Sequence, residues 1–164
     1  MRHFTFYALT VIILTTVSCS SIDCPMNTLV YTQYQLRNAA EAVDTLRDTL
    51  TVSTVRTDGS DSVLINRDIN VTEFSLPISY AGTQDIFYIE TTDTLTRRPT
   101  LDTITVTKEN TPHFESVDCS PTFFHTLTGV SCTHNAIDSV VIIHPDVDYD
   151  TSRKHFNIYF KHRR

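Results

Sequence analysis

Apolar and polar residues alternate along most of the chain, in segments separated by turn residues. A period of two is typical of β-strands that bury one face. Residues 46–55 and 63–66 flank Thr57-Asp58-Gly59-Ser60, a strong turn signal, and together predict a hairpin. The other segments that predict strands are 29–36, 74–78, 85–91, 101–107, 123–127, 137–143 and 155–160.

Three segments refine this pattern. Pro77 lacks a backbone donor, so 74–78 belongs at a strand end or a sheet edge. Residues 85–91 form a denser apolar run, which predicts a strand buried on both faces. The helix-friendly patch at 38–43 is too short to stand alone and is expected to be a turn or a single helical turn. We therefore predict an all-β fold, an antiparallel β-sandwich of about eight to ten short strands, with a β-barrel as the alternative.

The N-terminal segment predicts export and a lipid anchor. Arg2 and His3 precede an apolar run over residues 4–17, which is shorter than the about 20 residues that a spanning helix needs. A small residue before a cysteine, as in Ser18-Cys19, is typical of a lipoprotein processing site. We expect a signal peptide over 1–18 and a diacylated Cys19. A signal peptide cut elsewhere, without lipidation, is the alternative.

The remaining chain suits one domain of ordinary size. We expect a short lipid tether over 19–27 and a single β-domain over 28–164. Five residue steps separate Cys19 from Cys24, and an extended chain covers about 17 Å over that distance. The domain is therefore expected to sit close to the membrane.

Composition supports strands and disfavours several partners. Threonine occurs 27 times, and its branched Cβ packs well on a pleated sheet. The formal net charge of −6 disfavours nucleic acid, so no nucleic-acid partner is expected. Only three glycines are present, which nearly excludes glycine-rich phosphate loops, and no cofactor is expected.

Lipidation of Cys19 would leave Cys24, Cys119 and Cys132, which permit one disulfide and one free thiol. Loop closure would contribute about 3 kcal/mol for a 119–132 bridge and about 4.7 kcal/mol for a 24–119 bridge, so energy hardly discriminates between them. We favour Cys24–Cys119, because Cys24-Pro25 and Cys119-Ser120-Pro121 are both turn contexts. Cys132 would then be the free thiol.

Histidines and aspartates crowd the second half of the chain, but no spacing matches a metal or catalytic motif. The five histidines between 113 and 155 lack H-x-H or H-x₃-H spacing and are expected on strand surfaces. Cys132 as a nucleophile, with His125 or His134 as base, rests on composition alone. No catalytic residue is therefore expected.

Residues 144–150 resemble a calcium loop only at first sight. An EF-hand would place glycine and glutamate where Thr151 and Asn157 stand. Asp146, Asp148 and Asp150 remain weak calcium candidates beside a solvated turn, and no metal site is expected.

The chain carries a series of short motifs at Cys24-Pro25, 61–66, 76–78, 102–104, 114–119, 135–140 and 157–160. Together they resemble small lipoproteins of the Bacteroidales type, a family with a domain of unknown function. The chain departs from that pattern at Ser120, where glycine is expected. The resemblance implies a lipid-anchored β-domain and supplies no catalytic residues.

The same bacteria are known for O-glycosylation at Asp-Ser/Thr followed by an aliphatic residue. A polar, polar, apolar sequence is also a common way for a strand to begin, and that is the simpler interpretation of any single site. The candidate hydroxyls are Thr45, Thr49, Ser62, Thr94, Thr103 and Ser139.

These observations predict a lipid-anchored envelope protein on the periplasmic face of a bacterial membrane, with the outer membrane favoured. A lone Asp23 after the lipidated cysteine argues against surface export, whose signals in these bacteria usually carry several acidic residues. We expect a non-catalytic interaction or assembly module that contacts the membrane through its lipid and an envelope component through its fold. A carrier of an apolar ligand and a hydrolase with a His/Asp site are the alternatives.

Overall fold

Ten β-strands pack as two sheets in the computed structural model, which describes Cys24 and residues 29–161. The expected signal peptide, Cys19 and nearly all of the tether lie outside the described residues. No helix occurs in residues 29–161. The strands are β1 Tyr31–Arg37, β2 Thr49–Val55, β3 Asp61–Asp68, β4 Glu73–Pro77, β5 Gln84–Thr92, β6 Pro99–His113, β7 Thr122–Cys132, β8 Ile137–Ile142, β9 Asp146–Val147 and β10 Phe156–Phe160.

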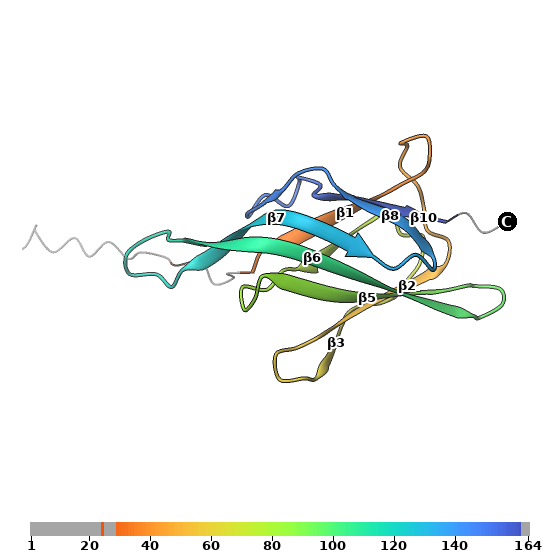
Figure 1. Ribbon diagram of the computed structural model, residues 1–164, viewed down its shortest axis with the longest axis horizontal. Coiled ribbons are helices and arrows are strands. Elements are labelled where there is room, and N and C mark those ends of the chain that lie inside the picture. The colour runs from red at the N-terminus through yellow and green to blue at the C-terminus, as the bar shows by residue number, and fades with distance from the viewer. Residues whose placement is uncertain (1–23, 25–28, 162–164) are drawn as a thin grey trace, which may run out of the picture.

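The two sheets face each other and do not close into a barrel (Figure 1). One has the strand order β4-β1-β10-β8, and the other has the order β3-β2-β5-β6-β7-β9. The all-β sandwich prediction is therefore confirmed. Neighbouring strands are antiparallel except β1 and β10, which pair in parallel with Tyr34 opposite Phe156. The first and the last strand of the chain thus lie side by side. The alternation of apolar and polar residues within each strand cannot predict this pairing.

The core fills the space between the sheets with inward-facing side chains. On the four-stranded sheet, Tyr34 of β1 stacks on Phe74 of β4 and on Phe156 of β10, with ring centroids 4.8 and 4.6 Å apart. These three rings are cross-strand neighbours, so the packing also fixes the register of the three strands. Opposite them lie buried residues of the other sheet, including Leu50, Val52, Phe87, Ile89, Ile104 and Val106.

Most segments form the strands that their alternation predicts. The 46–55 and 63–66 segments form the β2–β3 hairpin, with Val55 opposite Asp61. Pro77 ends the edge strand β4, as expected of a residue without a backbone donor. The 38–43 patch forms a turn.

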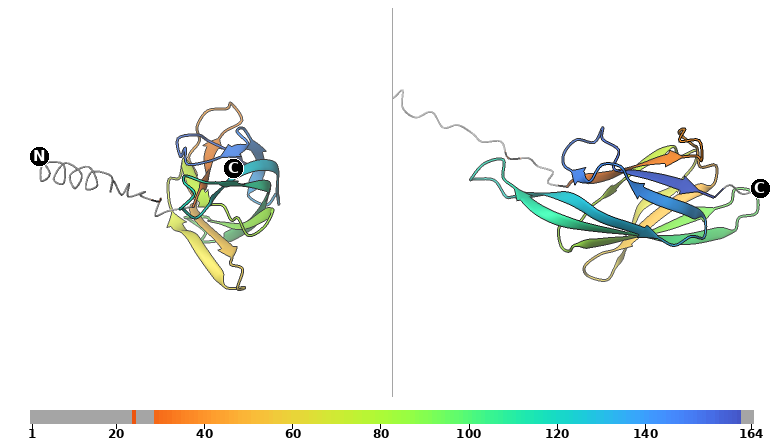
Figure 2. Two further views of the ribbon diagram at one scale, coloured as in Figure 1. Left: turned by 90° about the vertical axis from the view of Figure 1, so that its left-hand side faces the viewer. Right: turned by 45° about the horizontal axis from the view of Figure 1, so that its top comes forward.

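The prediction that residues 85–91 are buried on both faces is wrong. In β5, Phe87 and Ile89 are buried, but Ile86, which precedes Phe87 and points to the opposite face, is 42 % exposed. Within Cys24 and residues 29–161, nothing forms a second layer over the outer face of the six-stranded sheet (Figure 2), so an apolar side chain there stays in contact with solvent.

β6 and β7 are longer than the short strands expected. β6 has 15 residues and β7 has 11, and their hairpin runs from Ile104 opposite Cys132 to His113 opposite Thr122. At about 3.3 Å per residue, β6 alone extends for about 46 Å. The hairpin reaches beyond the other strands at one end of the molecule (Figures 1 and 2).

The chain enters the described fold through a disulfide at that same end. Cys24 is bonded to Cys119, which lies in the β6–β7 connection. This is the pairing favoured from the sequence, and Cys132 is a half-buried free thiol. A link across 95 residues constrains the unfolded chain over most of the domain.

One carboxylate fixes the place where the chain leaves the six-stranded sheet for the other. Asp102 of β6 is 1 % exposed. Its two oxygens accept hydrogen bonds from the Thr133 hydroxyl (2.7 Å) and from the backbone N–H groups of Asn135 (2.8 Å), Ala136 (2.7 Å) and Ile137 (2.9 Å). Burial alone would raise the pKa of Asp102, but these donors outweigh it and hold the pKa below the ordinary value. The β7–β8 connection is therefore folded around an ionised, fully bonded carboxylate.

We predict that Asp102→Asn lowers the free energy of unfolding by roughly 2–4 kcal/mol, because an amide group would turn a donor toward backbone donors. Chemical denaturation monitored by circular dichroism measures the loss. Asp138→Asn is the matched control, since Asp138 is exposed and stands in the same Asp-Ser/Thr-aliphatic pattern. Equal stability of the two variants would contradict the structural role of Asp102.

Candidate functional site

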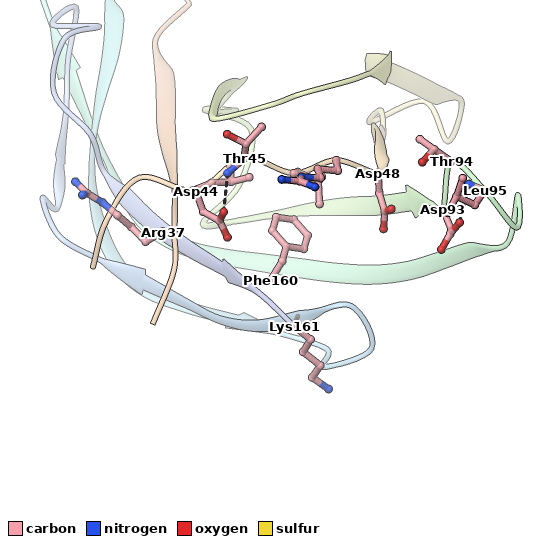
Figure 3. A pocket seen from close by; sticks show the side chains of 12 residues that line it. Arg37, Asp44, Thr45, Asp48, Asp93, Thr94, Leu95, Phe160 and Lys161 are labelled. Carbon is pink, nitrogen blue, oxygen red and sulfur yellow. Dashed lines mark hydrogen bonds between the residues drawn. The ribbon is translucent and has the colours of Figure 1, made fainter. Parts of the chain in front are cut away.

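A hollow of about 540 Å³ opens at the end of the sandwich where β6 begins, opposite the β6–β7 connection that holds Cys119. Its walls come from the β1–β2 connection, the β5–β6 turn and the end of β10 (Figure 3). Leu36, Leu46 and Phe160 supply the apolar part of the lining. Its charged residues are Arg37, Asp44, Arg47, Asp48, Asp93 and Lys161.

The β1–β2 connection is held in shape by its own hydrogen bonds. The Asn38 side chain accepts bonds from the N–H groups of Ala40 (2.9 Å) and Ala42 (3.1 Å). Glu41 adopts a left-handed conformation with φ of 58°, which is unfavourable for a residue with a Cβ. Arg37 donates to the Glu41 carbonyl at 2.8 Å and the Tyr159 hydroxyl donates to its carboxylate, so contacts from β1 and β10 hold this residue in place.

The β5–β6 turn forms the opposite wall around Asp93. The Asp93 carboxylate accepts hydrogen bonds from the N–H groups of Leu95 (2.8 Å) and Thr96 (2.7 Å). An aspartate that caps the turn in this way is a common local arrangement. It leaves the Leu95 side chain 91 % exposed at the rim.

Three of the six Asp-Ser/Thr-aliphatic triplets border the hollow, although they are distant in sequence. Thr45 and Thr94 are exposed in the two connections. The Thr49 hydroxyl donates to the Thr92 carbonyl at 3.0 Å, so β2 and β5 use it for pairing. The other three candidate hydroxyls, Ser62, Thr103 and Ser139, are half-buried on β3, β6 and β8.

Charges of both signs surround the opening, and part of each set is used by the fold. Lys161 donates to the His134 carbonyl, and Asp44 accepts a bond from the Thr45 N–H at 2.8 Å. Figure 3 shows Asp48 and Asp93 projecting from different connections toward the same space, with Phe160 beside it. Arg47 is exposed and lines the hollow. The arrangement can bind a polar, charged partner through a mixed-charge rim around a small apolar floor.

A second polar cluster lies inside the sandwich, nearer the disulfide end. Lys108 is 1 % exposed, and its ammonium group donates to Asp85 (2.6 Å) and to the Gly82 carbonyl (3.0 Å). Asn110 donates to the Gly82 and Tyr80 carbonyls and accepts a bond from Nδ1–H of His125 at 2.7 Å. The network ties the β4–β5 connection to the β6–β7 hairpin.

Burial shifts the titration of this cluster. Desolvation, reinforced by the Lys108 charge, lowers the pKa of His125 to about 4. Desolvation raises the pKa of Asp85, and the Lys108 ammonium only partly offsets it. The polar groups of Lys108, Asn110 and His125 face one another and the backbone. The cluster therefore stabilises the fold from inside, and we call it the internal brace.

The free thiol is not activated in the way that a nucleophile requires. Desolvation and the nearby Asp102 charge raise the pKa of Cys132 above its ordinary value. His134 Nδ1 lies 3.8 Å from the Cys132 sulfur, but it donates its hydrogen to the Asp138 carbonyl at 2.7 Å. This nitrogen therefore carries a proton and cannot accept one from the thiol.

The weak calcium candidates are engaged by a cation of the chain itself. Arg153 contacts Asp148 (3.5 Å) and Asp150 (3.6 Å), and it donates to the Asp146 carbonyl. Asp148 and Asp150 also cap the N–H groups two residues ahead of them. In the part of the chain that the structure describes, no group of three or more His, Cys, Asp or Glu residues could hold a metal ion.

The five histidines between residues 113 and 155 are dispersed, and two of these five are inside the fold. His125 and His155 are buried, whereas His134 and His144 are exposed. His113 is half-buried and stacks on Phe124 with the ring centroids 4.3 Å apart. The expectation of strand-surface histidines is therefore wrong for His125 and His155, because the core accepts a neutral imidazole that has a hydrogen-bond partner.

The sequence did not predict that the residues of either cluster lie together. The hollow depends on how three segments distant in the chain pack against one another, and no local sequence pattern indicates that packing. The internal cluster had a signal: Lys108 follows Ile104 and Val106 on the inward series of β6, and a charged residue there must find a buried partner.

We predict that the free energy of unfolding falls as the pH is lowered from about 6.5 toward 4, because the unfolded chain protonates His125 before the folded chain does. The lowered pKa of His125 corresponds to a loss of at most roughly 3 kcal/mol in the free energy of unfolding. His155, whose pKa is also lowered by burial, acts in the same direction.

Denaturation curves for the wild type, His125→Gln and His144→Gln at pH 7 and pH 5 measure this effect. His125→Gln should lose less stability between the two pH values than the wild type, and His144→Gln, at an exposed site, should behave as the wild type does. Equal pH dependence in all three proteins would contradict the assignment.

Comparison with known proteins gives a match over most of the fold. Residues 49–160 match the sequence profile described as "Family of unknown function (DUF6452)". This range runs from the start of β2 to the end of β10 and includes the β5–β6 turn and Phe160 of the hollow. No curated protein and no solved structure shows significant similarity to the chain.

Proposed function

Because the chain belongs to the DUF6452 family of unknown function, we propose its role from its own geometry: a lipid-anchored, non-catalytic interaction module of a bacterial envelope. Cys19 carries the lipid, on the periplasmic face of the outer membrane. The hollow at the other end of the sandwich receives a protein partner. The protein belongs to the Bacteroidales type of small lipoprotein.

The observation that carries this proposal is the separation of the two ends by β6. The β5–β6 turn, which forms one wall of the hollow, precedes β6, and the β6–β7 connection with Cys119 follows it. The length of β6 places these features about 46 Å apart. A chain held to a membrane near Cys24 would therefore present the hollow away from the lipid (Figure 1).

The short tether restricts how the domain can be placed relative to the membrane. Cys19 can lie at most about 17 Å from Cys24. Since Cys24 is fixed to Cys119, the lipid connects to the fold itself and not to a long linker. The hollow is then held at a restricted height above the membrane face, which suits binding to another envelope component.

The chemistry of the hollow supports a polypeptide partner. Its rim carries acidic and basic residues together, and such a mixed surface is suited to specific, oriented contacts with a complementary protein. Asp44 and Asp93 cap their own turns, which supports recognition and not acid–base chemistry. The interior between the sheets is occupied by packed core side chains, which gives no support to a carrier of an apolar ligand.

We predict that Cys19→Ala releases a folded, soluble domain, whereas Cys24→Ala keeps the protein in the membrane fraction and lowers its stability by about 4 kcal/mol. Membrane fractionation, intact mass of the acylated chain and denaturation measure these outcomes. Cys132→Ala is the matched control for loss of a thiol outside the disulfide. A Cys19→Ala protein that stays in the membrane fraction, or a wild-type mass without acyl groups, would refute the anchor.

The hollow is tested by photo-crosslinking from its rim in native membranes. A benzoylphenylalanine at position 95 should capture a specific partner, and one at Val63, 59 % exposed on the edge strand β3, should not. Arg47→Glu should reduce capture from position 95 by at least about tenfold, because a reversed charge meets complementary charge on the partner.

Arg56→Glu is the matched control, since Arg56 is also exposed but lies in the β2–β3 turn outside the hollow. Unchanged capture by Arg47→Glu, or equal capture from positions 95 and 63, would refute a partner site at the hollow.

A further inference from the structure

The tip of the β6–β7 hairpin exposes apolar side chains beside the disulfide. Val117 is 97 % exposed and Phe114 is 60 % exposed, and both lie in the connection that contains Cys119. Cys119 itself is 7 % exposed. The loop is therefore anchored at its cysteine while its apolar residues face outward.

A belt of aromatic rings surrounds the base of this tip. Tyr80 of the β4–β5 connection stacks on Phe123 of β7, with ring centroids 5.0 Å apart. Phe124 lies edge-on to Tyr149 at 5.1 Å. Tyr80 is 63 % exposed and Tyr149 is 41 % exposed, so both present part of an apolar ring to the surroundings. The Tyr149 hydroxyl donates to the Thr122 hydroxyl at 2.8 Å, which fixes its ring against β7.

We propose that this end of the molecule enters the interfacial region of a lipid bilayer. Phe114 and Val117 reach the boundary of the acyl chains, and Tyr80 and Tyr149 lie at the level of the headgroups. Tyrosine prefers that level because its ring is apolar and its hydroxyl is wet. The inference rests on the proposed lipid anchor and adds a second, non-covalent contact with the membrane.

A bilayer is the occupant that the chain connectivity favours. Cys24 is bonded to Cys119 in this loop, and Cys19 lies five residues before Cys24. An acyl chain on Cys19 therefore holds the tip within about 17 Å of the membrane surface. The two acyl chains expected on Cys19 hold the protein at the bilayer by themselves, and contact by the tip adds a fixed orientation of the domain to that anchor.

The charge of the tip selects the type of lipid. Residues 109–128 contain Glu109, Glu115 and Asp118 and include no lysine or arginine. Glu115 pairs with His113 at 3.2 Å. An acidic tip is repelled by anionic headgroups, so the surface that it enters is zwitterionic.

The chain has no tryptophan, which makes a direct test possible. Phe114→Trp places a single fluorophore at the tip, and Leu95→Trp places a matched one at the opposite end, where Leu95 is 91 % exposed. Both acylated, full-length proteins are bound to phosphatidylcholine vesicles that carry bromine on the acyl chains. Flotation with the vesicles reports the anchor separately.

Fluorescence of Phe114→Trp should be quenched at least about twofold and shifted to shorter wavelength, while Leu95→Trp should remain unquenched. Replacing half of the lipid by phosphatidylglycerol should reduce the quenching. Val117→Trp gives a second tip reporter if Phe114→Trp unfolds, as judged by circular dichroism.

The outcomes separate the two proposals. Failure of the wild type to float refutes the anchor. Flotation with unquenched tryptophan at both tip positions overturns the inference and leaves the anchor intact. A blue shift that depends on protein concentration and not on brominated lipid would show that a second copy covers the tip, and it also overturns the inference. Quenching that is undiminished in phosphatidylglycerol overturns the choice of a zwitterionic surface.

Discussion

The buried carboxylate of Asp102 is the contact on which the arrangement of the two sheets depends. Four donors from residues 133–137 converge on it, at the point where the chain passes from β7 to β8 and so from one sheet to the other. A buried charge is tolerable only with such complete bonding, and once bonded it is directional in a way that apolar packing is not. It determines where β8 begins, and β8 in turn pairs with β10 beside β1.

The long strand that carries Asp102 also organises the molecule along its length. Asp102 lies near the hollow end of β6, Lys108 near its middle, and His113 at the tip end. The strand thus carries the sheet crossing, the internal polar brace and the approach to the disulfide in that order. Since one continuous strand connects the two ends of the molecule, the ends are held at a fixed separation. The proposed orientation on a membrane depends on this rigidity.

The polar groups inside the sandwich are there for different reasons. Lys108 and Asp85 neutralise each other, and His125 stays neutral because burial and the Lys108 charge oppose its protonation. In the hollow, by contrast, acidic and basic groups stand at a solvent-facing rim. The first arrangement is closed within the sandwich, whereas the second faces solvent and also bonds to its own connections through Asp44 and Asp93. The difference between the two clusters therefore follows from burial and bonding and not from residue type.

Alternation of apolar and polar residues determined the all-β class, most strand positions, the β2–β3 hairpin and the edge position of Pro77, because these depend on neighbours within one segment. The turn contexts of Cys24 and Cys119 also favoured the disulfide that forms. The exposed Ile86, the buried His125 and the parallel pairing of β1 with β10 could not be predicted, since each depends on which layer or strand lies opposite. Asp102 and Lys108 could be predicted only in part. The alternation places both side chains on the inward face of β6, but their bonding partners lie 23 or more residues away in the sequence. The hollow and the aromatic belt were decided by tertiary structure alone, because each collects side chains from strands and connections that only the packing of the two sheets brings together.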